Sequence, residues 1–220
     1  MLCSGGLDST TVLYYAINEG YDVFPVSFDY KQRHAVELTF VRKTLEKIGL
    51  ADRWTVFHLD FSQIGNSALT DLSLDVPEGR SPEEMEQTIP ISYVPLRNTF
   101  FLTYVAAFAE TRDIQDIFIG VNVLDYSGYP DCRPEYITSI EQTLNLGSRY
   151  VDDLAKKFTI HTPLINKTKA EIIELGRSLG VDYRLTWSCY NPKVVDGRIE
   201  PCGECDSCIL RAKGFDEASK

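Results

Sequence analysis

Residues 4–10, with the sequence Ser-Gly-Gly-Leu-Asp-Ser-Thr, combine small and hydroxyl side chains in one short turn. Its two glycines allow the backbone to pass close to a ligand and to adopt positive φ angles. A helical pattern of apolar residues follows at residues 11–19. Because a helix N-terminus presents unpaired N–H groups and the positive end of a dipole, this arrangement predicts a phosphate or pyrophosphate site.

This loop differs from two common phosphate-binding motifs. No Gly-Lys-Ser/Thr follows it, as in a Walker A loop, and it lacks the GxGxxG spacing of dinucleotide-binding folds. It resembles the pyrophosphate loop (PP-loop) of ATP pyrophosphatases, which adenylate a substrate and release pyrophosphate. A Gly-rich turn capped by Asp8 or Ser9 is the alternative. Since only Met1-Leu2-Cys3 precede the loop, the first strand is either very short or incomplete in this sequence.

The C-terminal tail contains four of the six cysteines, spaced as Cys189-x12-Cys202-x2-Cys205-x2-Cys208. Outside an oxidising compartment, such clustering favours metal binding over disulfides. Four thiolates at short intervals suit tetrahedral Zn²⁺, although an iron–sulfur cluster uses similar spacings and two disulfides are arithmetically allowed. We favour a structural zinc ion, because four protein ligands leave no open position for chemistry.

The composition is that of one medium globular domain: 220 residues, 44% hydrophobic and 25% charged. No apolar run is long enough to span a membrane, and no signal peptide is visible, so we expect a cytoplasmic protein without a membrane partner. The net charge of −10 argues weakly against direct binding of nucleic acid, which usually needs a basic patch.

Strand and helix patterns alternate along the chain. After the helix at 11–19, apolar β-type runs lie at 21–28, 54–59, 116–122 and 158–163, and helical patterns lie at 35–48, 99–110, 135–145 and 169–179. This alternation predicts an α/β fold with a mostly parallel sheet covered on both faces. Residues 62–92 are rich in Ser, Gly, Asp, Glu and Pro, which predicts a mobile loop over a site or a disordered insertion.

Several motifs then occur together in one order. They are the loop at 4–10, Phe-Asp-Tyr-Lys-Gln-Arg-His at 28–34, Pro-Leu-Arg-Asn at 95–98, Asp-Tyr-Ser-Gly-Tyr-Pro-Asp-Cys-Arg at 125–133, Ile-His-Thr-Pro-Leu at 160–164, and the cysteine tail. Over essentially the whole chain, this combination closely resembles the 7-cyano-7-deazaguanine synthase family of queuosine precursor synthesis. The resemblance implies a Rossmann-like fold of the adenine nucleotide alpha hydrolase type, with a PP-loop ATP pyrophosphatase domain at 1–185 and a zinc-binding tail at 186–220. It also implies a homodimer.

The activity implied by the resemblance converts 7-carboxy-7-deazaguanine, ammonia and ATP into 7-cyano-7-deazaguanine. A carboxylate is a poor electrophile without a leaving group. Adenylation provides one, and ammonia then displaces AMP to give an amide. A second activation, at the amide oxygen, allows dehydration to the nitrile. Both activations need a pyrophosphate site, Mg²⁺ and a cavity that excludes water.

The resemblance also assigns the nucleotide site. Asp8 would bind Mg²⁺, with capping of the helix as the alternative. Arg97 would neutralise ATP phosphates or the substrate carboxylate with its planar guanidinium, with a surface ion pair as the alternative. The phosphates would lie against Ser4, Gly5, Gly6, Leu7, Asp8, Ser9 and Thr10, and adenine against the main chain of Ser27 and Phe28.

The polar and aromatic stretch at 125–133 would read the deazaguanine. Carboxylates accept hydrogen bonds from a guanine-like N–H edge, and aromatic rings stack on a base. A tight Gly-Pro loop held by its own hydrogen bonds is the alternative. Cys132 is better explained as a small packed residue than as a nucleophile. The substrate-binding candidates are Asp125, Tyr126, Tyr129, Asp131 and Arg133, with Arg33, Gln32 and His34 as weaker ones.

Two other classes of function compete with this interpretation. Another PP-loop enzyme is one: a tRNA-thiolating or lysidine-forming enzyme, an ammonia-dependent NAD synthetase, or a relative that attaches a deazaguanine to a macromolecule. A tRNA enzyme would carry a basic face or an RNA-binding domain, and a thiolating one a catalytic cysteine pair near the loop. A non-catalytic zinc-containing binding module is the other, and it would not need Asp8, Arg97 or Asp131.

Overall fold

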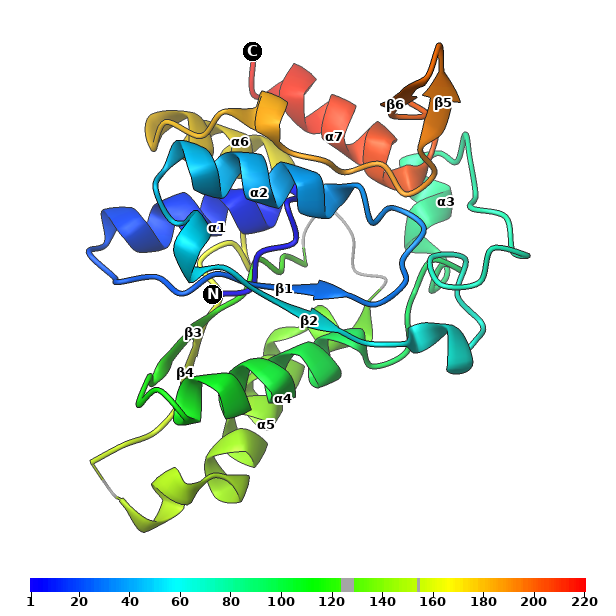
Figure 1. The fold of residues 1–220 in the computed structure, drawn as a ribbon. Coiled ribbons are helices and arrows are strands. Elements are labelled where there is room, and N and C mark those ends of the chain that lie inside the picture. Colours follow the sequence, from blue (N-terminus) through cyan, green and yellow to red (C-terminus); the bar gives the residue numbers. More distant parts are fainter. Residues whose placement is uncertain (124–128, 154) are drawn as a thin grey trace.

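The computed structural model describes residues 1–123, 129–153 and 155–220 (Figure 1). Strand β1 (Val26–Asp29) pairs in parallel with β2 (Thr55–His58), and β3 (Asp116–Phe118) pairs in parallel with β4 (Thr159–His161). Residues 1–3 join the two pairs. Leu2 forms a parallel bridge with Val26 and donates its N–H to the Phe118 carbonyl at 3.0 Å.

Residues 1–3 therefore lie in the sheet, in the strand that the loop requires. With them included, the strands lie across the sheet in the order β2, β1, residues 1–3, β3, β4. Numbered by their position along the chain, this is the order third, second, first, fourth, fifth. This is the order of a doubly wound Rossmann-type sheet, whose ligand crevice lies where the direction of winding reverses, beside the first strand. The predicted α/β fold with a parallel sheet is confirmed.

Helices cover both faces of this sheet. On one side lie α1 (Leu7–Asn18), α2 (Glu37–Lys47), α6 (Lys169–Ser178) and α7 (Asp206–Glu217), and on the other lie α4 (Arg97–Glu110) and α5 (Pro134–Gly147) (Figure 1). Two buried apolar clusters fill the layers. One joins β1 and β3 to α4 and α5, and the other joins residues 1–3 to α1, α2 and α6.

The observed strands are shorter than the predicted ones, whereas the five predicted helices agree to within a few residues. Pro25 lies directly before β1, and its carbonyl accepts the N–H of Thr55 at 3.0 Å. A proline at this point removes no donor from the ladder, so it is compatible with a central strand.

Residues 62–92 pack against the C-terminal tail. They contain the short helix α3 (Pro82–Glu86), which begins with a capping box between Ser81 and Glu84. Glu78 forms an antiparallel bridge with Cys205, and Gly79 donates its N–H to the Glu204 carbonyl at 2.8 Å. None of these residues lines the central cavity described below, so the predicted loop over a site instead supports the cysteine tail.

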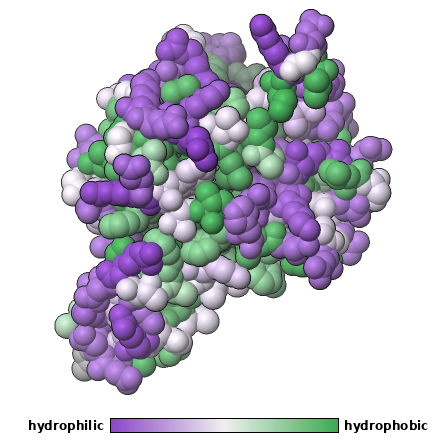
Figure 2. Space-filling view, in the orientation of Figure 1, coloured by the Kyte–Doolittle hydropathy of each residue, from purple (hydrophilic) through white to green (hydrophobic). Residues whose placement is uncertain are grey.

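The tail itself contains elements that the sequence patterns did not predict. Strands β5 (Lys193–Val195) and β6 (Arg198–Glu200) form an exposed antiparallel hairpin, where hydrophobic and hydrophilic side chains lie side by side at the upper right of Figure 2. Helix α7 then packs closely on α6, since a Cβ at Gly214 would lie 2.3 Å from Cγ of Lys169. Within the described ranges, no helix is both long and apolar enough to cross a membrane.

Candidate functional site

A cavity of about 280 Å³ lies at the carboxyl ends of the parallel strands. Residues 2–4 and 6–9 form one wall, and the ends of β1 and β3 form its floor. The start of α4 and residues 187–211 of the tail complete the lining. The cavity therefore lies beside the first strand, where a doubly wound sheet binds its ligand.

The backbone of the loop requires a glycine at one position. Gly5 has a φ of +79°, and a Cβ there would lie 2.6 Å from the carbonyl oxygen of Glu37. Gly6, with a φ of −74°, directly precedes α1, and a Cβ there would lie 3.3 Å from the rotatable hydroxyl of Ser4. Both the backbone turn and the approach of α2 therefore depend on Gly5.

Hydrogen bonds within the loop hold its shape. The hydroxyls of Ser4 and Ser9 lie 3.0 Å apart, and the Ser4 N–H donates to Oγ of Ser9 at 3.2 Å. Gly120 allows the end of β3 to approach the first turn of α1, since a Cβ there would lie 2.9 Å from the Ser9 nitrogen. Of the predicted phosphate-binding residues, Ser4, Gly6, Leu7, Asp8 and Ser9 line the cavity, whereas Gly5 and Thr10 lie behind it.

Asp8 forms an ion pair and does not cap the helix. Both its carboxylate oxygens accept hydrogen bonds from Nζ of Lys169, at 2.8 and 2.9 Å. Lys169 is the first residue of α6 and also lines the cavity. The carboxylate and the ammonium group thus lie together beside the loop, where a metal ion and phosphate oxygens would need them.

Two arginines extend into the cavity from opposite walls. Arg97, at the start of α4, is half-buried and donates to the hydroxyl of Tyr30 at 3.4 Å. Arg211, on α7, donates to hydroxyl groups of Thr186 and Ser188 and to the carbonyl of Tyr183. Among the described residues, neither guanidinium forms an ion pair with a carboxylate. Each is therefore free to neutralise an anion.

The predicted adenine-binding residues separate into two roles. Phe28 lines the cavity and stacks on Phe101, with ring centroids 4.1 Å apart. Ser27 does not line it: its hydroxyl donates to the Cys3 carbonyl and accepts from the indole of Trp54 at 2.8 Å. Ser27 therefore supports the junction of β1 and the first strand.

The stretch at 125–133 is only partly inside the cavity. Asp125 and Tyr126 lie outside the described residues. The ring of Tyr129 lines the cavity, 5.8 Å from the guanidinium carbon of Arg97. Asp131 is buried behind it and accepts the backbone N–H of Asn98 at 2.9 Å. Asp131 thus caps α4, and Arg133 is exposed and away from the cavity.

Cys132 lines the cavity but is unsuited to nucleophilic attack. Burial, followed by the charge of Asp131, raises the pKa of its thiol to about 12. The side-chain amide of Asn98 donates to its sulfur at 3.3 Å. The thiol stays protonated at neutral pH, which supports its interpretation as a packed small residue.

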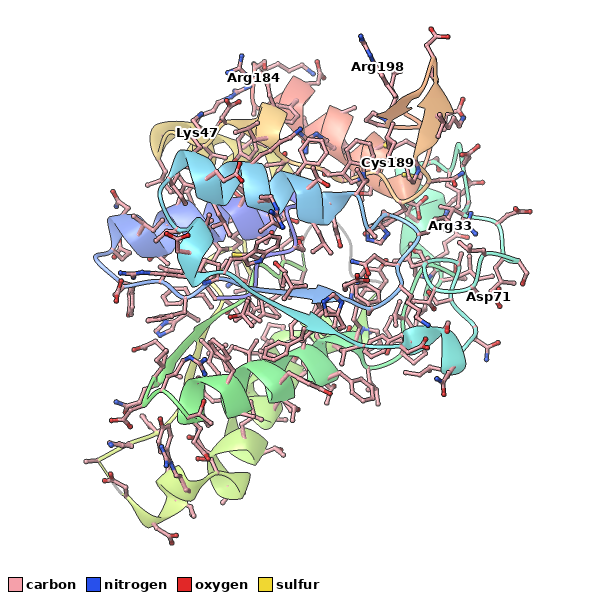
Figure 3. The ribbon with its side chains drawn as sticks, in the orientation of Figure 1. Arg33, Lys47, Asp71, Arg184, Cys189 and Arg198 are labelled. Carbon is pink, nitrogen blue, oxygen red and sulfur yellow. The ribbon has the colours of Figure 1, made fainter. Side chains whose placement is uncertain are left out.

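Arg33 takes part in the packing of the loop that follows β2. Its guanidinium donates to the carbonyl of Leu74 at 2.7 Å and to that of Asp71 at 3.4 Å (Figure 3). It does not line the cavity. Its Nε is buried and has no hydrogen-bond partner among the described residues, but the guanidinium lies against this loop and not in the cavity.

The sequence patterns missed several cavity residues that come from the second half of the chain. The helical pattern at 169–179 gives Lys169 a place on a helix but no chemical role, and Trp187, Tyr190 and Arg211 belong to no recognised motif. The backbone N–H of Trp187 donates to the Gly5 carbonyl at 2.8 Å, which fixes the tail to the loop. No local pattern marks these residues, because their approach to the loop is created only by the fold.

The four tail cysteines converge beside this wall. Their sulfur atoms all lie within 4.8 Å of one another, with Cys189 and Cys202 at 3.5 Å and Cys202 and Cys208 at 4.0 Å. A zinc ion with thiolates at about 2.3 Å requires sulfur separations of about 3.8 Å. Backbone N–H groups of Tyr190, Cys202 and Cys205 point at the sulfurs, as around bound thiolates. The cluster can therefore hold a tetrahedral metal ion.

Comparisons with known proteins agree with this geometry. The family model described as "Queuosine biosynthesis protein QueC" matches residues 1–219. A 7-cyano-7-deazaguanine synthase of Desulfatibacillum aliphaticivorans is 50% identical over 99% of this chain and 91% of its own length. That of Picrophilus torridus is 51% identical over 99% of this chain and 86% of its own length.

One solved structure, a 4-thiouridine synthetase–RNA complex with bound ATP, matches 99% of this chain and 50% of its own chain, at 19% identity and a TM-score of 0.49. The family match and the curated relatives both span nearly the whole chain, and the chain belongs to the QueC family of queuosine biosynthesis proteins.

Proposed function

We propose that the chain is a 7-cyano-7-deazaguanine synthase that activates 7-carboxy-7-deazaguanine with ATP and replaces the activated oxygen with nitrogen from ammonia. The observation that carries this proposal is the juxtaposition, in one cavity, of the glycine loop at the start of α1 and two guanidinium groups that pair with no carboxylate in the described part of the chain. In a chain with a net charge of −10, this local cationic site favours an anionic ligand.

ATP would bind with its phosphates against residues 4–9 and the N-terminus of α1. Lys169 and Arg211 would neutralise phosphate oxygens, and Asp8 would hold Mg²⁺, which prefers carboxylate and phosphate oxygens. Phe28, at the end of β1, offers an apolar surface for the adenine. A magnesium ion would draw charge from the leaving pyrophosphate.

The acid substrate would enter between the tail and α4. Tyr129 and Tyr190 line this part of the cavity and offer aromatic faces to a planar deazaguanine. Arg97 would bind the carboxylate to be activated. Asp131 contributes by fixing the first turn of α4, and hence Arg97, while Asp125 and Tyr126 remain predicted readers of the base.

The chemistry follows from the cavity's shape and polarity. Arg97 and the loop N–H groups stabilise negative charge while the carboxylate oxygen attacks the α-phosphate of ATP. Apolar walls around Phe28 and Tyr129 exclude water, which would otherwise hydrolyse the acyl adenylate. Ammonia then displaces AMP. The resulting amide is activated in the same place before it loses its oxygen to form the nitrile.

A zinc ion in the four-cysteine cluster would be structural. It would fix residues 187–211, which form one wall of the cavity, so its effect on activity would be exerted through the shape of the site. This close association makes the tail a part of the catalytic unit, although the division at residues 185 and 186 remains a prediction.

An ATP–pyrophosphate exchange assay tests the proposal. Radioactive pyrophosphate should enter ATP only when 7-carboxy-7-deazaguanine is present, without any need for ammonia. Exchange that depends on a different acid would assign the chain another activation reaction. Absence of acid-dependent exchange by metal-loaded protein would contradict the proposal.

A further inference from the structure

A buried polar cluster borders the cavity between the end of β1 and the start of α2. Glu37, the first residue of α2, and His34 both line the cavity, and their side chains are only 10% and 5% exposed. Nε2 of His34 lies 3.6 Å from Oε2 of Glu37. The catalytic steps described above do not use either group.

Gln32 fixes the orientation of the glutamate. Its Oε1 accepts the N–H of Tyr30 at 2.8 Å, and its Nε2 donates to the Phe28 carbonyl at 3.2 Å and to Oε1 of Glu37 at 3.0 Å. Two main-chain contacts thus hold the amide in one orientation. One oxygen of Glu37 is bound to this amide, and the other faces His34.

The cluster is incomplete in one respect. Nδ1 of His34 is buried and has no hydrogen-bond partner among the described residues. Leaving a buried polar atom unpaired is unfavourable, so such an atom beside a cavity indicates that a polar ligand completes it. With the ring proton assigned to Nε2, the nitrogen that faces Glu37, Nδ1 is an acceptor, and a ligand that pairs with it must donate a hydrogen bond.

We propose that Glu37 is the base that deprotonates ammonium, and that His34 Nδ1 accepts a hydrogen bond from the same nitrogen. This inference rests on the proposed synthase function and assigns a site to its nitrogen substrate. Ammonium, the main form of ammonia at neutral pH, has no lone pair and cannot attack a carbonyl carbon. The enzyme therefore needs a base close to the activated acid.

The proton balance is simple. An N–H bond of ammonium breaks, and the proton moves to the Glu37 carboxylate, forming O–H. The lone pair of the resulting ammonia attacks the acyl carbon, the bond to the AMP oxygen breaks, and AMP leaves with that electron pair. The new C–N nitrogen then releases one proton to solvent, which gives the neutral amide.

Burial suits Glu37 to this task. It raises the pKa of the carboxyl group to about 8, against the smaller opposing effects of Gln32 and Arg97. A general base works best when its pKa lies near the operating pH, so a group that titrates at about 8 can take a proton from ammonium and return it to solvent as the pH approaches that value. Burial also lowers the pKa of His34 to about 3, which leaves a neutral ring able to accept a hydrogen bond.

The variant Glu37→Gln tests the proposal, because it keeps the shape and an acceptor for Gln32. Ammonium-dependent formation of amide and nitrile should fall about a hundredfold or more. Acid-dependent ATP–pyrophosphate exchange should stay within a few-fold of the unmodified protein. Glu46→Gln, an exposed change on the same helix, is the matched control and should leave both reactions unchanged.

Hydroxylamine separates a base from a merely structural residue. It is largely uncharged at neutral pH and needs no deprotonation before it attacks. The Glu37→Gln variant should therefore form the hydroxamate at close to the normal rate while failing with ammonium. Equal losses with both nucleophiles, or full activity with ammonium, would overturn the proposal.

The variant His34→Gln tests the second contact. Loss of one hydrogen bond to ammonium should raise KM for ammonium about tenfold, with little change in exchange. An unchanged KM would remove His34 from the site. If the unmodified protein showed no acid-dependent exchange, the synthase function itself would fail, which is distinguishable from failure of the ammonium site.

Discussion

At the scale of single residues, the loop depends on a glycine whose neighbours are backbone atoms. Gly5 combines positive φ with a clash that any Cβ would make with the Glu37 carbonyl, whereas the nearest atom to a Cβ at Gly6 is the rotatable Ser4 hydroxyl, at 3.3 Å. The sequence motif predicted two permissive glycines, and only the structure distinguishes their roles.

The first prediction concerns these two positions. Gly5→Ala should lower the free energy of unfolding by about 1–3 kcal/mol, through backbone strain and displacement of α2. Gly6→Ala should cost less than about 1 kcal/mol, because its φ suits any residue. Urea denaturation measures both losses in the free energy of unfolding, provided that the variants and the unmodified protein have equal m-values. Equal losses at the two positions would contradict this account.

A second prediction concerns the arginines. Arg97→Met should lower acid-dependent exchange about a hundredfold, since it removes the guanidinium that faces the developing negative charge. Arg133→Met is the control, because Arg133 is exposed and does not line the cavity. If the two variants lost exchange equally, the cavity would not be the site of activation.

A third prediction follows from the raised pKa of Glu37. A folded-state pKa of about 8, above the ordinary 4.5, means that the protein loses stability as pH rises between these values. Glu37→Gln removes this loss. The difference in unfolding free energy, variant minus unmodified, should therefore increase from pH 5 to 8, by up to about 1.4 kcal/mol per pH unit.

Buried His34 contributes the opposite trend, below pH 6.5, in both proteins, and it largely cancels in the comparison. Denaturation curves at several pH values provide the measurement. A difference that does not vary with pH would mean that the Glu37 carboxyl group titrates normally in the folded state.

At the scale of elements, the sequence predicted the helices whose apolar residues recur at a helical spacing. The five predicted helices were confirmed, because each has an apolar face whose spacing matches a helix. Residues 1–3 pair on both sides within the sheet, as their position directly before the loop required. Helix α3, the β5–β6 hairpin and α7 were missed, because they depend on contacts with distant segments.

The functional residues divide in the same way. The loop is contiguous in sequence, so its chemistry could be recognised directly. Lys169 and Arg211 lie far along the chain and reach the cavity only through the packing of α6 on α1 and of α7 on α6. Asp131 appeared as a ligand candidate because of its charge, whereas the fold uses this carboxylate to cap α4.

A fourth prediction tests the tail as a wall of the site. Cys202→Ser should abolish the stoichiometric binding of zinc, which elemental analysis measures. It should also weaken ATP binding, because Trp187 of the tail donates its backbone N–H to the carbonyl of Gly5 in the loop. Cys132→Ala, outside the cluster, should retain the metal. Normal zinc content in Cys202→Ser would exclude this cysteine as a ligand, and full ATP affinity without zinc would separate the tail from the cavity.

At the scale of the whole molecule, the fold concentrates cationic groups in one place in a chain that is acidic overall. Arg97, Lys169 and Arg211 come from three helices on two faces of the sheet and meet the loop at the ends of the strands. The family's homodimer remains a prediction for this chain, which sedimentation can test.

Product analysis tests the central claim most directly. The metal-loaded protein is incubated with 7-carboxy-7-deazaguanine, ATP, Mg²⁺ and ammonium, and the products are identified by mass spectrometry. We predict 7-cyano-7-deazaguanine together with AMP, with the nitrile nitrogen labelled when ¹⁵N-ammonium is supplied. Unchanged acid, or AMP formed equally without the acid, would contradict the account.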